Sequence, residues 1–454
     1  MNRALPEAMV DFLRLSGATS DHNELKGFSR REWEQALIWL DDAGLALYFL
    51  RNLEHKNATE MVPTEVLSRL KRSFAANQQR VARMAHEFSS LNQRFDEASV
   101  RYLVVKGLSL VPQFCSDAFL RHQSDFDYLV DDESLALARR IVEQTGYSLK
   151  THSTHEFTFV MPSARMPVLD EQYEAHAPYA VELHLGFGHA DFDGTCLAAP
   201  QFSVDHARTH EWQGLTFRTL LEEDAFLLQA VHAWCHILRG WVRMSWLYEI
   251  GYFLSRRATD SSLWGRIERR VGDDRQLREI VVVIAELAAQ FFRAPLPCTL
   301  RIWAKDLRPA VRIWIQNYAR TWIFGENRVD QFSLLPSAKL VLFLHQQYAS
   351  DTGARRRLVW AQLLPSTRLY RIARSIRSQP STIISARWRQ RERVFRRLFF
   401  HITAGLRYVW EIPRWRRFCK AAASPLADSS GIEMGSGALI KPPQTSSRRN
   451  SSST

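Results

Sequence analysis

The stretch "RHQSDFDYLV", residues 121–130, holds two aspartates one residue apart in a segment that alternates polar and apolar side chains. Alternation with a period of two is typical of a half-buried β-strand, so we predict a strand over residues 125–130. Residues two apart on a strand point to the same face, which places Asp125 and Asp127 together and the apolar side chains behind them. Two carboxylates this close repel each other unless a cation lies between them.

A hard divalent cation suits such a pair of aspartates. Mg²⁺ takes oxygen ligands and accepts one or two carboxylates together with substrate phosphates. The pair therefore indicates a site for a metal ion and a nucleotide. For a D-x-D pattern alone, a solvated strand face is the alternative.

The segment upstream, "YLVVKGLSL" at residues 102–110, predicts a short buried strand followed by a turn and a short helix from Leu108 to Phe114. Backbone N–H groups at a glycine-containing turn and a helix start attract phosphate oxygens, and Lys106 adds a positive charge. A phosphate-binding turn is one interpretation of Gly107. An ordinary strand-to-helix turn is the other.

The segment downstream, "AVELHLGF" at residues 180–187, supplies a third carboxylate. In a strand, Glu182 and His184 share one face and the apolar residues share the other. An exposed face of an edge strand is the alternative. Arg121, just before the aspartates, is either a surface residue or a contact to a nucleotide phosphate.

The rest of the chain is predicted to be mainly helical. We expect a long polar helix from about Thr64 to Glu97, and a helix capped by Asp132 or Ser134 that ends near Thr145. The pattern divides the chain into an N-terminal helical region, a mixed α/β core, a C-terminal helical region and a disordered tail rich in Ser, Gly and Pro. The boundaries of these four parts are 1–95, 96–215, 216–420 and 421–454.

Taken in order, these motifs resemble the bacterial uncharacterised nucleotidyltransferase family of the DNA polymerase β superfamily. The resemblance is carried by "LVVKGLSLVPQFCSDAFLRHQSDFDYLV" at residues 103–130 and by "VELH" at residues 181–184. The family shows an L-K-G turn, an Arg shortly before D-h-D-h-h-V, and a late (D/E)-L-H strand. The resemblance covers roughly residues 60–260.

The resemblance implies an α+β fold, with a polymerase-β-like core and a mixed sheet flanked by an N-terminal and a larger C-terminal helical region. It implies a metal-dependent transferase that moves NMP from an NTP, ATP among them, to a hydroxyl group by a two-metal mechanism. Two Mg²⁺ ions, with Mn²⁺ as the alternative, would be held by the catalytic carboxylates Asp125, Asp127 and Glu182. The nucleotide would be held by Lys106, Gly107, Ser109 and Arg121. The superfamily prefers Gly or Ser directly after the glycine of the turn, whereas here Leu108 follows Gly107 and Ser109 comes one place later.

The resemblance does not select the acceptor. A small molecule, a peptide, a protein or an RNA would each serve. Two other functions stay open: a non-catalytic protein that binds nucleic acid or a membrane surface, and a toxin-like nucleotidyltransferase that modifies tRNA or a protein.

The positive charge of the chain is concentrated near its C-terminus. Residues 351–420 hold 18 Arg and Lys against three Asp and Glu, a balance of +15, whereas the whole chain carries +12. Arg368, Arg371, Arg374 and Arg377 recur every three residues, and Arg389, Arg393 and Arg396 recur almost every four. Such helix faces could bind RNA or another anionic partner, lie on an anionic membrane, or pack as ordinary solvated faces.

Other features concern the compartment and a possible zinc site. The longest apolar run, residues 280–292, is interrupted by Glu286, so we expect no transmembrane span. Five scattered cysteines without a C-x-x-C pair fit a reducing cytoplasm, so we expect a cytoplasmic protein. Because of the basic segment, peripheral association with a membrane is the alternative location. His232 and His236 have a spacing that suits zinc, but no Glu lies between them, so we favour helix packing or a substrate-lining role.

Overall fold

The computed structural model describes residues 4–16, 25–162, 172–187, 200–325, 336–363 and 383–422, with the side chains of residues 325, 336–338 and 383–398 excepted. The predicted arginine row from Arg368 to Arg377 and residues 423–454 of the predicted tail lie outside these ranges. The same holds for the side chains of Arg389, Arg393 and Arg396. Those predictions therefore stay predictions.

The strands form one mixed seven-stranded sheet in the order β3-β4-β5-β2-β1-β7-β6. Neighbouring strands are parallel in the pairs β2–β5 and β1–β7 and antiparallel in the others. Their bounds are β1 Tyr102–Val104, β2 Asp125–Val130, β3 Ser148–His152, β4 Glu156–Val160, β5 Ala180–His184, β6 Ala207–Trp212 and β7 Leu215–Leu220. The predicted α+β class with a mixed sheet is confirmed.

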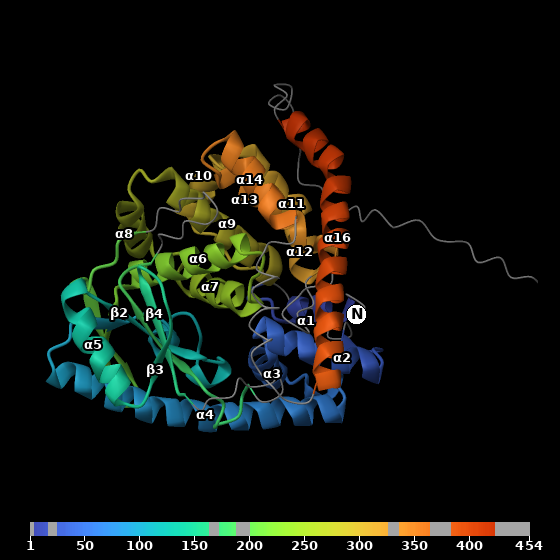
Figure 1. The fold of residues 1–454 in the computed structure, drawn as a ribbon. Helices are drawn as coiled ribbons and strands as arrows, with labels where there is room; N and C mark the ends of the chain where they lie inside the picture. Colours follow the sequence, from blue (N-terminus) through green and yellow to red (C-terminus); the bar gives the residue numbers. More distant parts are fainter. Residues whose placement is uncertain are drawn as a thin grey trace, which may run out of the picture.

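One face of the sheet packs on helix α4 (Thr64–Glu97), which runs beneath the sheet and the N-terminal helices in Figure 1. The apolar residues of α4 recur at helical spacing, so they form one buried stripe. In this stripe, the Phe88 ring lies 5.7 Å from that of Phe126, and the Phe95 ring lies 5.3 Å from that of Tyr128. The apolar face of β2 is thus buried, and its two aspartates face the other way.

The segments around β2 differ in detail from the prediction. Helix α5 (Asp132–Gln144) follows β2, but its N-cap is Asp131, whose side chain accepts a hydrogen bond from Ser134 N at 2.8 Å. The expected helix from Leu108 to Phe114 is a single 3₁₀ turn, η3 (Gly107–Leu110). Pro112 lacks the N–H that a further helical turn would need.

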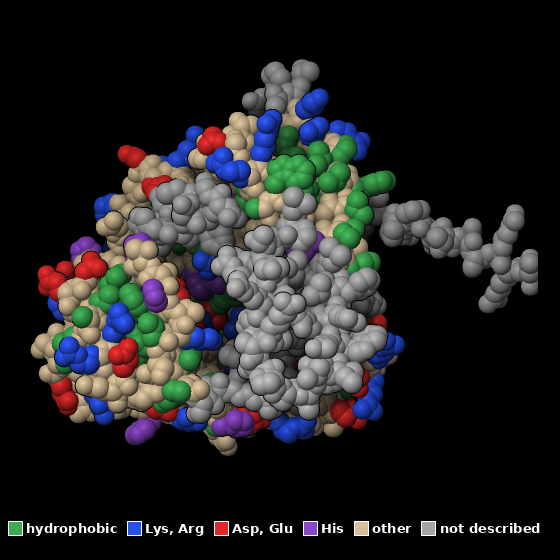
Figure 2. Space-filling view, in the orientation of Figure 1, with side chains coloured by type: hydrophobic (Ala, Val, Ile, Leu, Met, Phe, Trp, Pro, Cys, Tyr) green, Lys and Arg blue, Asp and Glu red, His purple; other side chains and the backbone are tan. Residues whose placement is uncertain are grey.

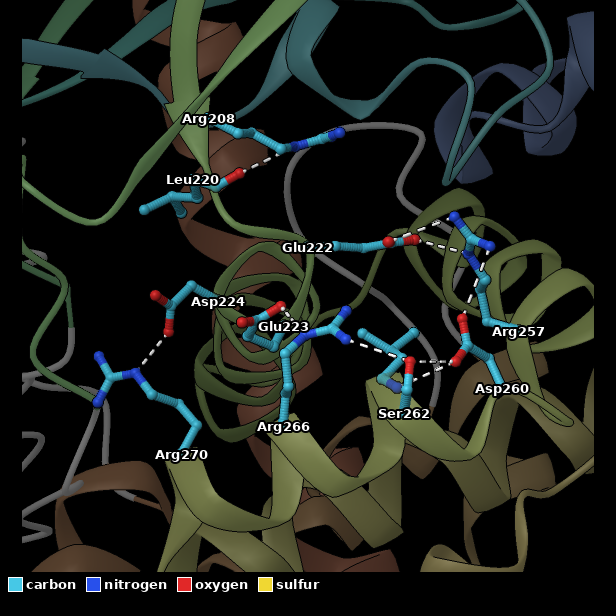
Figure 3. A network of polar contacts seen from close by, with 11 residues as sticks. Arg208, Leu220, Glu222, Glu223, Asp224, Arg257, Asp260, Ser262, Arg266 and Arg270 are labelled. Atoms are coloured by element: carbon cyan, nitrogen blue, oxygen red, sulfur yellow. Dashed lines mark hydrogen bonds and ion pairs between the residues drawn. The ribbon is translucent and has the colours of Figure 1, made fainter.

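Helix α6 covers the polar side of the sheet and starts directly after β7. Helices α6 (Glu222–Leu238), α7 (Met244–Arg257), α8 (Ser261–Val271) and α9 (Arg275–Phe292) pack together above the strands (Figure 1). Figure 3 shows the ion pairs that anchor the first turn of α6: Glu222 with Arg257, Glu223 with Arg266 and Asp224 with Arg270, at 2.7, 3.1 and 2.6 Å. In the same view Arg208 Nε donates to the last carbonyl of β7 at 3.2 Å. These contacts fix the orientation of α6, whose later turns border the site.

The remaining helices contribute to the same buried core. Its residues form one connected cluster, whose first member in the sequence is Leu5 and whose last is Tyr408. The N-terminal helices are α1 (Ala4–Phe12), α2 (Arg30–Ala43) and α3 (Ala46–His55). The C-terminal ones are α10 (Cys298–Lys305), α11 (Pro309–Asn317), α12 (Ala319–Gly325), α13 (Leu342–His345), α14 (Thr352–Leu363) and α16 (Ile383–Ala422), with the 3₁₀ helix η6 (Pro336–Val341). Among the described residues, no helix combines the length and apolar character needed to cross a membrane.

Candidate active site

The site lies where β1 ends and where β2 and β5 begin. Strands β2 and β5 are parallel neighbours, and their register sets Asp127 beside Glu182. Lys106 follows β1 and reaches the same face of the sheet. Three segments that are distant in the sequence therefore bring Lys106, Asp125, Asp127, Glu182 and His184 together.

Asp127 is the centre of this group. The residue is 2 % exposed, and its Oδ1 lies 2.6 Å from Lys106 Nζ and 3.1 Å from His184 Nε2. His184 Nε2 also lies 3.6 Å from Glu182 Oε2. The other carboxylate oxygen, Asp127 Oδ2, is buried and has no hydrogen-bond partner among the residues that the structure describes. Because buried polar atoms are usually paired, Oδ2 is an available acceptor for a ligand.

The pKa values of the three carboxylates shift in different directions. Burial raises the pKa of Asp125 to about 6, with Asp127 adding to the rise and Lys106 opposing it. Burial raises the pKa of Glu182 to about 8, again with contributions from Asp127 and Asp125. For Asp127, burial acts in the same direction but is outweighed by Lys106 and His184, which hold the pKa well below its usual range. The cluster thus carries more acidic groups than its cations balance, and this favours a bound cation.

The donor set fits a divalent metal ion. One atom each from Asp127, Glu182 and His184 lie within 4.8 Å of one another, which is compact enough for a shared ion. Asp125 is outside this trio but lies on the same face of β2, and its Oδ2 accepts a hydrogen bond from Ser124 Oγ at 3.2 Å. The strand alternation predicts that His184 shares a face with Glu182, but it indicates no role for His184 in the site. Its approach to Asp127 depends on the pairing of β5 with β2.

Two of the residues predicted to bind phosphate do not reach the cavity described below. Gly107 has φ +63° and is buried, and a Cβ added there would lie 2.7 Å from Gln123 Cδ. Ser109 is also buried, and its hydroxyl donates to the carbonyl of Lys106 at 3.1 Å. The turn is therefore filled by Gln123, and the positive charge at this place comes from Lys106.

Arg121 lines the cavity, and an ion pair with Glu249 holds its side chain in place. Its Nε donates to Glu249 Oε1 at 3.1 Å, and the Tyr48 hydroxyl donates to the same oxygen at 2.9 Å. Glu249 lies on α7 and is 2 % exposed. No sequence signal pointed to Glu249, because it is 128 residues from Arg121. The contact with Glu249 uses Nε, so within the described part of the chain this ion pair does not occupy the two terminal nitrogens of the guanidinium.

A cavity of about 590 Å³ joins these groups. One wall is the polar face of the sheet, with Lys106, Asp125 and Glu182, and the opposite wall comes from α6 and α7. The face shown in Figure 2 is hollowed near its middle, and basic, acidic and His side chains are visible inside. Such a mixture suits a charged ligand with a planar part better than a purely apolar one.

The helical wall is aromatic. His232 lies with its ring centroid 4.7 Å from Trp246, and His236 lies 4.0 Å from Trp241 and 4.6 Å from Trp246. All four residues line the cavity. The histidine pair predicted from its helical spacing thus packs against tryptophans and borders the cavity.

One comparison with known proteins identifies a family. The model of a family described as uncharacterised nucleotidyltransferase matches residues 29–293, more than half of the chain. The matched segment contains all the strands of the sheet and the helices from α2 to α9. Searches of the curated proteins and of the solved structures found no match.

Proposed function

The chain belongs to the uncharacterised nucleotidyltransferase family, and on this premise we propose that it transfers NMP from an NTP to a hydroxyl group of an acceptor. The observation that carries the proposal is the orphaned, buried oxygen of Asp127 beside Glu182 and His184 at the edge of a cavity large enough for a nucleotide. The Asp127 carboxylate is paired with Lys106 and His184 through Oδ1, but burial of its second oxygen without a hydrogen bond is costly, so this oxygen suits contact with a ligand.

Asp125, Asp127 and Glu182 would hold two divalent ions, Mg²⁺ or Mn²⁺. Bound there, the ions would neutralise charge on the phosphates and on the leaving oxygen. His184 either adds a nitrogen ligand or orients Asp127 through its hydrogen bond, as residues around metal ligands commonly do.

The remaining residues bind and orient the nucleotide. Arg121, held by Glu249, directs its free guanidinium nitrogens to phosphate oxygens. Lys106 stands between Asp127 and the cavity and limits the negative charge that the phosphates meet. Gly107 and Ser109 act at a distance from the phosphates, by shaping the turn that carries Lys106.

In the reaction, the acceptor oxygen forms a bond to the α-phosphorus and the bond from that phosphorus to the bridging oxygen breaks. Pyrophosphate leaves with the bonding electron pair. Glu182, which lines the cavity, takes the proton of the acceptor hydroxyl.

The test is incubation of the full-length protein with each labelled NTP, Mg²⁺ and a cell extract, followed by identification of the labelled product. Wild type should label one class of acceptor, and Asp127→Asn should abolish the label. Asp132→Asn, at an exposed position on α5, is the matched control and should label as wild type does.

Two outcomes would select the other functions. A protein that binds no Mg-NTP, yet binds RNA or lipid until it is truncated after residue 350, is a binding protein. Growth arrest on expression, together with label on tRNA or on a protein, would identify a toxin-like enzyme.

A further inference from the structure

The outer face of helix α16 is apolar and exposed. Its large apolar side chains recur at intervals of three and four residues, so they form one stripe along the helix. The members of this outer stripe, with their exposed fractions, are Phe399 53 %, Ile402 52 %, Leu406 65 %, Val409 53 % and Trp410 80 %. Isolated exposed apolar residues are common, but a continuous row of this kind marks an interaction surface.

The inner face of α16 is already packed, so the outer stripe is not a misplaced core face. Tyr408 is 4 % exposed, its ring stacks on Phe343 at 4.7 Å, and its hydroxyl accepts a hydrogen bond from Gln346 Nε2 at 2.7 Å. Glu411, one turn later, is 4 % exposed and accepts from the Tyr318 hydroxyl at 3.4 Å. One face of α16 therefore packs on the rest of the protein, and the opposite face is exposed to solvent.

Helix α14 enlarges the surface. Lys339 Nζ donates to the carbonyls of Leu363, at the end of α14, and of His401 on α16, both at 3.4 Å, and so ties the two helices together. Trp360 on α14 is 61 % exposed. Figure 2 shows green side chains gathered near the upper end of α16, with blue side chains next to them.

Cationic side chains surround this apolar surface. The exposed ones on α14 and α16 are Arg355, Arg356, Arg357, Arg407, Arg414, Arg416, Arg417 and Lys420. Glu411 pairs with Arg407 at 2.8 Å and lies 4.0 Å from Arg414, which leaves the end of α16 strongly positive. Beyond Pro413 the helix face that carried the outer stripe continues with Arg417 and Lys420.

We propose that this surface docks on a bilayer rich in anionic phospholipid. The outer stripe enters the boundary between headgroups and acyl chains, and the surrounding Arg and Lys contact lipid phosphates. Charge complementarity and the aliphatic content of the stripe select this partner. A second copy of the chain would bring like charges together, and a nucleic acid would leave Ile402, Leu406 and Val409 without apolar contacts.

Flotation of the full-length protein with vesicles tests the proposal. Affinity for vesicles of phosphatidylcholine with phosphatidylserine should exceed that for phosphatidylcholine alone by more than ~10-fold, and it should fall with added salt. Equal binding to both kinds of vesicle, or binding to neither, would overturn the proposal.

Two pairs of variants separate the apolar and the electrostatic parts. Leu406→Ser with Trp410→Ser should weaken binding more than ~10-fold, whereas Ile302→Ser, at a position 55 % exposed on α10, should leave it unchanged. Arg416→Glu with Arg417→Glu should also weaken it more than ~10-fold. Lys71→Glu with Arg72→Glu, at exposed positions on α4, makes the same change in net charge and should have a small effect.

Other results would replace the membrane with a different partner. If wild type forms a dimer that Leu406→Ser with Trp410→Ser dissociates, and neither protein floats, the surface is a contact between copies. If wild type binds RNA but no vesicles, the arginines of α14 and α16 bind nucleic acid and not lipid. Thermal melting checks that each variant is folded, and Trp410→Ser alone replaces the double variant if it is not. NMP transfer in solution should be unchanged in all of these variants, which keeps this test separate from that of the proposed function.

Discussion

Arg80 on helix α4 holds the starts of the two strands that carry the carboxylates. It is 1 % exposed, and its guanidinium donates to four backbone carbonyls in the loops before β2 and β5. The acceptors are Gln123 at 3.2 and 3.4 Å, Glu174 at 3.4 Å, Pro178 at 3.2 Å, and Ala177. Gln123 and Pro178 each lie two residues before their strand. Arg80→Met keeps most of the side-chain volume and removes all of these hydrogen bonds.

The expected loss of stability follows from these contacts. A hydrogen bond from a charged donor contributes roughly 1.5–3 kcal/mol, and most of those made by Arg80 are long. Arg80→Met leaves several buried or part-buried carbonyls without this donor, and each such loss costs roughly 1–3 kcal/mol. We therefore expect Arg80→Met to lower the free energy of unfolding by about 3–5 kcal/mol. Urea titration followed by circular dichroism measures it. Because the strand starts are released, Mg-NTP affinity should also fall, by more than ~10-fold, in the folded variant.

Arg83, one turn further along α4, gives the matched control. It donates to the carbonyl of Ala175 at 3.1 Å, in the same loop, but its side chain is half exposed. Arg83→Met should cost less than ~1 kcal/mol, as exposed ion pairs usually do. Equal effects of Arg80→Met and Arg83→Met, or no change in nucleotide affinity with Arg80→Met, would refute the reasoning.

Further predictions concern Arg121, the turn and a buried histidine. Glu249→Gln keeps the hydrogen bond to Arg121 but removes the charge, so the KM for NTP should rise several-fold with little change in kcat; a fall in kcat alone would contradict a positioning role. Gly107→Ala should destabilise the protein by about 1–2 kcal/mol or more, because the position has both positive φ and a crowded side, whereas Gly214→Ala, with positive φ and open space, should cost less in the same urea titration. Burial, with a contribution from a nearby arginine, lowers the pKa of His210 to about 4. Between about pH 6.5 and 4 the unfolded chain therefore binds a proton that the folded chain does not, so stability should fall with pH, and His210→Gln should reduce that fall in urea titrations across this range.

The sequence predicted those parts of the fold that depend on local periodicity. The period of two over residues 125–130 matches β2, and the helical pattern from Thr64 to Glu97 matches α4. The stretch "HEFTFVM" from His155 also predicted a strand, which is β4, whereas β3, β6 and β7 were not singled out. Strands β3 and β6 are the two edge strands and β7 lies next to β6. Each has exposed residues, and β3 has no buried one, so the apolar signal is weak.

The site was predictable to the extent that its residues follow one another along a strand. The alternation aligned Asp125 with Asp127 and Glu182 with His184, but adjacency of the two strands came from the family resemblance and not from their own residues. Glu249 was out of reach, because an ion pair between a loop and a distant helix leaves no local pattern. The close packing of Gln123 against Gly107 was not predictable either, because no local pattern indicates which side chain fills the turn.

The most direct test of the central claim is a calorimetric titration of Mn²⁺ into the full-length protein with a non-hydrolysable NTP analogue present. We predict saturable binding of the metal ion with the nucleotide in wild type and a loss of more than ~10-fold in affinity in Asp127→Asn. Asp132→Asn should bind as wild type does. Binding that is unchanged by Asp127→Asn, or no binding in wild type, would contradict the assignment of this cluster as the metal and nucleotide site.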